Sequence, residues 1–185
     1  MGEQHKKHSR REHLNDFHLN VAGEYVYDGA LYACQSDDAK QRRIKRAVWG
    51  MAAILIVAVI AGGCIPAPGM QNCFYVLLPY LGEFLGAASV IWALVKLGTD
   101  WSAVREYNYQ KSVAVLPVRT AVTAVFSLLG IVCELIFFFV NDHAGQTFFA
   151  LLYVLLKLTA LLSALVLRAE IMQAEWDKLP KKDNS

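Results

Sequence analysis

Four long apolar runs cross this chain of 185 residues and constrain its fold more than any other feature. They cover residues 47–63, 74–97, 118–140 and 146–167. Each run is close to the roughly 20 residues that an α-helix needs to cross about 30 Å of hydrocarbon. Only helices and closed barrels satisfy every backbone polar group in lipid, and these runs lack the alternation of barrel strands. The sequence therefore predicts an all-α membrane protein with four transmembrane helices in an antiparallel bundle.

Basic side chains are distributed unevenly among the segments that flank these runs. They gather in the N-terminal tail, between the second and third runs, and in the C-terminal tail. The two other connections, residues 64–73 and 141–145, contain no Lys or Arg. By the positive-inside rule, both termini are expected to be cytoplasmic, with short outer loops. We expect a multi-pass protein, and a prokaryotic plasma membrane is the simplest home for so compact a chain.

The chain accordingly divides into three parts. These are a cytoplasmic basic tail over residues 1–46, a four-helix transmembrane domain over residues 47–168, and a cytoplasmic tail over residues 169–185. The length leaves no room for a separate soluble domain.

Three local features are expected on the cytoplasmic side. The Tyr-rich segment 24–34 holds two β-prone pieces around the dipeptide Asp28-Gly29, which favours a tight hairpin. Ser36 is suited to cap a helix that continues into the first span. This helix would pass through a basic cluster formed by Lys40, Arg42, Arg43, Lys45 and Arg46. Between the second and third spans, a short helix is expected near Asp100, and Trp101 would lie at the level of the lipid headgroups.

Three charged side chains lie deep inside the predicted spans, away from their ends: Glu83, Glu134 and Lys157. Counted from the outer ends of their helices at about 1.5 Å per residue, all three fall in one layer about 10–17 Å deep. A charge at that depth costs at least about 2.5–3.5 kcal/mol, so each side chain should face the bundle interior and find a partner. Two acids and one base allow a Glu–Lys–Glu network, in which the second carboxyl would tend to be protonated.

Small and polar residues share the helix faces that bear these charges. Such residues let helices approach closely, and their hydroxyls can bond across the interface. The candidates for helix packing or for lining a polar pathway are Gly82, Gly86, Thr123, Ser127, Gly130 and Tyr153. The second, third and fourth spans are therefore expected to form the core, with the charge-free first span packed outside.

Two cysteines, Cys64 and Cys73, lie at the two ends of the first outer loop. Pro and Gly residues bend this loop, so a disulfide could close it in an oxidising compartment. The spacing alone does not show whether the geometry of a bridge is met.

No motif in the sequence names a reaction, and we expect no enzyme activity. The net charge of +2 is too small to indicate nucleic-acid binding, and no cofactor or metal site is expected. The first hypothesis is a non-enzymatic accessory or assembly subunit, within a homo-oligomer or a larger membrane complex. The alternative is a proton- or cation-coupled transporter or channel subunit that uses the buried Glu–Lys–Glu layer. An intramembrane charge pair can also do no more than hold a bundle together, so the layer does not decide between them.

Overall fold

The computed structural model describes residues 17–19, 25–27, 29–141 and 147–179. The histidines at positions 5, 8, 13 and 143, Asp28 of the predicted hairpin turn, and most of the predicted outer turn lie outside these residues. The helices are α1 (Asp38–Cys64), α2 (Pro68–Asn72), α3 (Phe74–Leu97), α4 (Glu106–Lys111), α5 (Leu116–Val140) and α6 (Thr147–Met172). Four of them, α1, α3, α5 and α6, are long and apolar enough to cross a membrane, so the chain is an integral multi-pass membrane protein.

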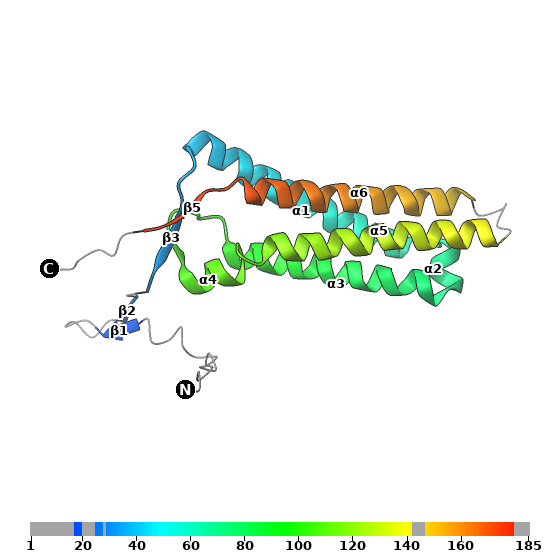
Figure 1. Ribbon diagram of the computed structural model, residues 1–185, viewed down its shortest axis with the longest axis horizontal. Coiled ribbons are helices and arrows are strands. Elements are labelled where there is room, and N and C mark those ends of the chain that lie inside the picture. The colour runs from blue at the N-terminus through cyan, green and yellow to red at the C-terminus, as the bar shows by residue number, and fades with distance from the viewer. Residues whose placement is uncertain (1–16, 20–24, 28, 142–146, 180–185) are drawn as a thin grey trace, which may run out of the picture.

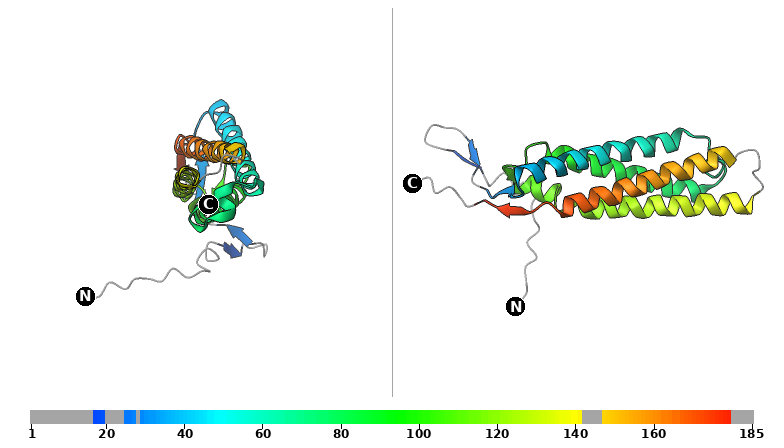
Figure 2. Two further views of the ribbon diagram at one scale, coloured as in Figure 1. Left: turned by 90° about the vertical axis from the view of Figure 1, so that its right-hand side faces the viewer. Right: turned by 90° about the horizontal axis from the view of Figure 1, so that it is seen from above.

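The four long helices form an antiparallel bundle, as predicted (Figure 1). Helix α6 packs along α1 and α5, helix α5 also packs along α3, and α3 meets α1 over a shorter stretch. Seen end-on, the helices surround a common axis (Figure 2). The expectation that the first span packs outside the other three is therefore wrong. Helix α1 is a full member of the bundle because its buried face is apolar and needs no charge to pack.

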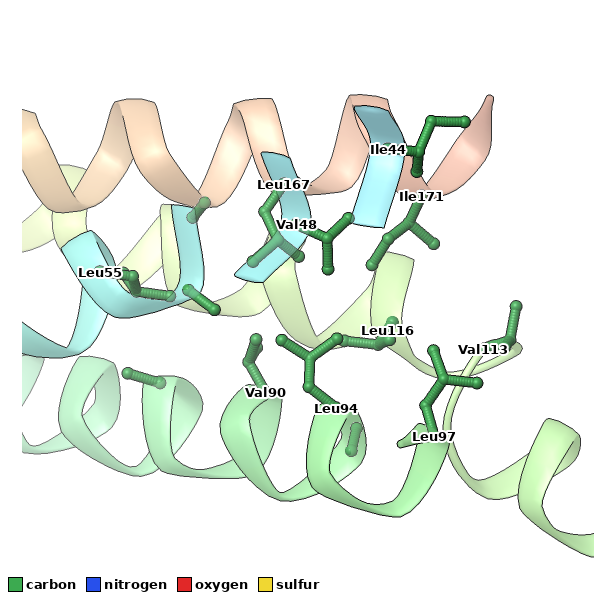
Figure 3. Packing of buried hydrophobic residues seen from close by; sticks show 14 of the residues in the cluster. Ile44, Val48, Leu55, Val90, Leu94, Leu97, Val113, Leu116, Leu167 and Ile171 are labelled. Atoms are coloured by element: carbon green, nitrogen blue, oxygen red, sulfur yellow. The ribbon is translucent and has the colours of Figure 1, made fainter. Parts of the chain in front are cut away.

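The apolar core lies toward the end of the bundle where the sequence is basic, which we call the basic end. Its residues come from all four long helices, and Figure 3 shows them pointing into the space between the ribbons. They include Ile44, Val48, Leu55, Val90, Leu94, Leu116, Leu167 and Ile171. The opposite end, which we call the α2 end, contains the buried charges instead.

Helix α1 begins before the first apolar run and passes through the basic cluster, as predicted. Its N-cap residue is Asp37, however, with no hydrogen bond from a capping side chain. The buried Ser36 hydroxyl has no hydrogen-bond partner, so the prediction that Ser36 caps the helix is wrong. Lys40 instead ties this end of α1 to the segment after α6 through Glu175, at 3.2 Å.

Two small antiparallel sheets lie at the basic end. Strand β1 (Phe17–Leu19) pairs with β2 (Tyr25–Tyr27). Strand β3 (Leu31–Cys34) is central to the second sheet, between β4 (Val104–Arg105) and β5 (Trp176–Lys178). The predicted hairpin, in which β2 would pair with β3, is therefore wrong. Pairing with distant strands overrides the local turn signal, and this sheet connects the N-terminal part, the α3–α5 connection and the C-terminal part of the chain.

Aromatic side chains join this sheet to the bundle. Trp101 is only 1% exposed, and its ring centroid lies 5.5 Å from that of Trp176. Tyr32 stacks on Tyr109 at 4.2 Å, and Tyr109 lies 5.8 Å from Trp176. The Trp101 ring is thus buried against other protein groups, and its level among the lipid headgroups stays a prediction. The predicted short helix is present as α4, which begins after β4 and not near Asp100.

The cytoplasmic location of the basic end can be tested by labelling single cysteines. Gln71→Cys and Ala103→Cys, each in a Cys-free background, place a thiol at an exposed position at one end of the bundle. A membrane-impermeant maleimide should label Gln71→Cys in intact cells and Ala103→Cys only in inverted vesicles, if the positive-inside rule holds. The reverse pattern would show that the basic end faces outward.

Candidate functional site

A buried ion pair joins α3 to α6 in the half of the bundle nearer the α2 end. Lys157 Nζ donates a hydrogen bond to Glu83 Oε2, and the side chains are 1% and 0% exposed. Burying two charges is costly, and their mutual attraction compensates only when other groups satisfy their remaining hydrogen-bonding capacity. The surroundings of the pair therefore decide whether it is stable.

Neighbouring side chains satisfy much of that capacity. The Ser127 hydroxyl on α5 lies 2.6 Å from Glu83 Oε1 and donates to it. Lys157 Nζ lies 4.5 Å from the ring centroid of Tyr80 and 5.0 Å from that of Tyr153, within the range of cation–π attraction. The aliphatic part of Lys157 passes close to Gly130, where an added Cβ would be 3.5 Å from Cε. Helices α3, α5 and α6 thus all contribute to the site.

Glu134 is also fully buried but does not join this pair. Its Oε1 accepts a hydrogen bond from the backbone N–H of Gly69 at 3.4 Å, and its Oε2 has no hydrogen-bond partner. Gly130, which lies beside Lys157, is one helical turn before Glu134 on α5, so Glu134 lies nearer the α2 end. The structure therefore contains a Glu–Lys pair and a separate carboxyl, and the three-membered network allowed by the sequence does not form.

Helix α2 closes the bundle over Glu134. It packs against α3, α5 and α6, and Pro68 and Gly69 are buried. An added Cβ at Gly69 would lie 2.1 Å from Glu134 Oε2, so only glycine lets the backbone approach the carboxyl this closely. The sequence predicts an outer loop over residues 64–73, and the structure folds Pro68–Asn72 of it into α2. The Pro and Gly residues and the absence of charge there were the available signals for a buried turn.

The predicted small-residue faces pack inside the bundle. An added Cβ at Gly82 would lie 2.5 Å from the Phe126 ring, and one at Gly86 would lie 2.6 Å from Thr123 Oγ1. Thr123 itself donates to the Arg119 carbonyl on its own helix. These glycines therefore allow α3 and α5 to approach closely, which is the packing role predicted for them.

One polar contact and one unsatisfied hydroxyl between the helices have no signal in the sequence. Arg119 Nη1 donates to the Ser89 carbonyl at 2.6 Å and joins α5 to α3 near the basic end. The Tyr153 hydroxyl is buried with no hydrogen-bond partner, in the same part of the core as Lys157. Both features depend on how the helices are rotated relative to one another, which the spacing of residues along one helix does not show.

All four cysteines are free in the structure. Cys64 is exposed and Cys73 is half-buried, and the disulfide that their spacing allows is not formed. Within residues 29–141 and 147–179, no three acidic, cysteine or histidine side chains gather closely enough to hold a metal ion.

The fold and the site define a class: a four-helix integral membrane protein with a buried ion pair and a separate buried carboxyl under the short helix α2. Comparison with models of protein families, with curated protein sequences and with solved structures finds no match for this chain.

Proposed function

We propose that this chain binds and releases a proton at Glu134 and acts as a proton-coupled transporter or channel subunit without enzyme activity. The observation that supports the proposal is the buried Oε2 atom of Glu134, which has no hydrogen-bond partner. An ionised carboxylate with an unsatisfied oxygen is far more costly in a buried site than the neutral acid. Glu134 is thus suited to hold a proton when it is buried as in this structure.

The ion pair strengthens this argument, because Lys157 pairs with Glu83 and is therefore not available to stabilise the ionised form of Glu134. Lys157 is engaged by Glu83, which also accepts a hydrogen bond from Ser127. Within the described residues, Glu134 has no ion-pair partner that would stabilise its charged form. The base can neutralise only one acid, so the two glutamates have different roles: Glu83 holds the bundle together and Glu134 exchanges a proton.

Helix α2 provides a means to couple that exchange to a change in structure. The Gly69 N–H donates to Glu134, and hydrogen bonds to a charged acceptor are roughly twice as strong as those to a neutral one. Loss of the proton would therefore strengthen the bond to α2 and also increase the need for water at the unpaired oxygen. Four spans are few for one pathway, so we expect the working unit to be a dimer or a larger complex.

The experiment compares Glu134→Gln with wild type by infrared spectroscopy and by proton flux in proteoliposomes. Wild type should show the C=O absorption of a buried protonated carboxyl, and Glu134→Gln should lose both that band and most of the flux. Glu175→Gln, at an exposed carboxyl, is the matched control and should change neither. Unchanged flux in Glu134→Gln, alone or combined with Glu83→Gln, would show that the proposal is wrong.

A second candidate function is the accessory or assembly subunit, and one feature of the sheet supports it. Strand β5 pairs with β3 alone among the described strands, and such an edge strand can accept a strand from another protein. The small-residue faces, by contrast, are already used inside the bundle. Purification from the native membrane in mild detergent distinguishes the two candidates. A stoichiometric larger partner favours the assembly role, and a homo-oligomer favours transport.

A further inference from the structure

A cluster of two lysines and two aromatic rings lies where α3 ends and α4 packs against it. Lys96 Nζ lies 5.5 Å from the ring centroid of Trp92 and 5.9 Å from that of Tyr107. Lys111 Nζ lies 5.8 Å from the same Tyr107 ring. We call Trp92, Lys96, Tyr107 and Lys111 the Trp92 cluster. Both ammonium groups thus lie close to the same Tyr107 ring.

These two lysines have no acidic partner in the part of the chain that the structure describes. Within the described residues neither Lys96 nor Lys111 forms an ion pair. The nearest acids in sequence, Glu106 and Asp100, accept hydrogen bonds from Gln110 and Ser102, and within the described residues neither carboxylate forms an ion pair with these lysines. Those two bonds from Ser102 hold the pKa of Asp100 below its ordinary value. The ammonium groups of Lys96 and Lys111 are therefore available to bind an external anion.

We expect the Trp92 cluster to lie at the level of the lipid headgroups. Trp92 is 60% exposed and lies near the end of an apolar transmembrane helix, which is a usual position for Trp at a membrane interface. The side chains of Leu78, Leu81 and Leu85 are exposed on the same face of α3, at helical spacing from Trp92. Figure 1 shows α4 at the end of the bundle where α3 finishes. An apolar strip thus leads directly to the two ammonium groups.

The geometry points to a binding site for an anionic phospholipid, with its phosphate group on Lys96 and Lys111 and an acyl chain along the exposed leucines of α3. Charge complementarity and the adjoining apolar strip select a lipid over a soluble phosphate. The site is distinct from the basic cluster at the start of α1, and it lies outside the buried charges, so it does not depend on the proposed function.

The test measures lipids bound to the purified full chain by native mass spectrometry in a neutral detergent. Wild type should retain phosphatidylglycerol in preference to phosphatidylcholine. Each surface lysine contributes about 1 kcal/mol to binding an anionic membrane, so the double variant Lys96→Gln/Lys111→Gln should bind phosphatidylglycerol roughly 30-fold more weakly. Trp92→Leu, which keeps an apolar side chain but removes the ring, should weaken binding by a smaller factor.

The matched control is Lys178→Gln, which removes one positive charge from an exposed position at the same end of the molecule. It should leave the preference for phosphatidylglycerol unchanged. All of these positions are at least partly exposed, so gel filtration and circular dichroism should show that each variant folds. The inference is overturned if wild type retains both lipids equally, if Lys178→Gln loses as much binding as the double variant, or if glycerol phosphate without acyl chains displaces the bound lipid.

Discussion

Replacing Lys157 by Met is expected to destabilise the folded bundle by about 3–5 kcal/mol, because it leaves the Glu83 carboxylate buried without its partner. Met has nearly the shape of the Lys side chain, so it fills the same space beside Gly130 and changes only the charge. The free energy of unfolding is measured by titrating a denaturing detergent into mixed micelles and following the loss of helix by circular dichroism.

The double variant Glu83→Gln/Lys157→Met separates the ion pair from the packing. Replacing both members of a buried pair by neutral groups is often close to neutral in stability, so the double variant should recover most of the loss. Lys40→Met is the control, since its pair with Glu175 is exposed and should contribute at most about 1 kcal/mol. If Lys157→Met is as mild as Lys40→Met, the ion pair does not hold the bundle together.

The four spans could be predicted from the sequence because length and composition alone determine whether a helix can cross a bilayer. The same argument predicted that Glu83, Glu134 and Lys157 face inward, since lipid does not accept a charge in the middle of the membrane. All three side chains are buried.

The pairing of these charges could not be predicted. Spacing places Glu83, Glu134 and Lys157 at similar depths, but the choice of partner depends on how the helices rotate and how close they come. Ser127 and the rings of Tyr80 and Tyr153 surround the Glu83–Lys157 pair, and Glu134 meets a backbone N–H of α2 instead. That N–H belongs to Gly69, and the pattern of side chains in the sequence does not show which backbone N–H will meet the carboxyl.

The sheet at the basic end was missed for a related reason. Its strands have two to four residues and are far apart in the sequence, so no local sequence pattern predicts them. A turn-forming dipeptide predicts a hairpin only if the two neighbouring pieces have no better partners. Here β3 gains two partners and places Tyr32 against Tyr109, which a hairpin with β2 does not provide.

The side chain that unites this end of the molecule is Trp101, and Trp101→Ala is expected to destabilise the fold by about 3–5 kcal/mol. Its ring is 1% exposed and lies against Trp176, and its indole N–H donates to the Gly98 carbonyl at 3.2 Å. Its own carbonyl accepts from the Cys34 N–H at 3.0 Å, which connects it to β3. Truncation leaves a cavity between the sheet and the bundle, and the measurement is again detergent unfolding.

A local readout shows whether Trp101 holds the sheet in place as well as stabilising the bundle. The Cys34 thiol is buried beside Trp101, so it should react slowly with maleimide in wild type and much faster in Trp101→Ala. Trp92→Ala is the matched control, because the same change at a 60% exposed ring should alter stability by at most about 0.5 kcal/mol and leave Cys34 protected. Slow labelling of Cys34 in Trp101→Ala would mean that strand pairing alone keeps the sheet closed. The aromatic contacts would then be a consequence of the sheet and not its cause.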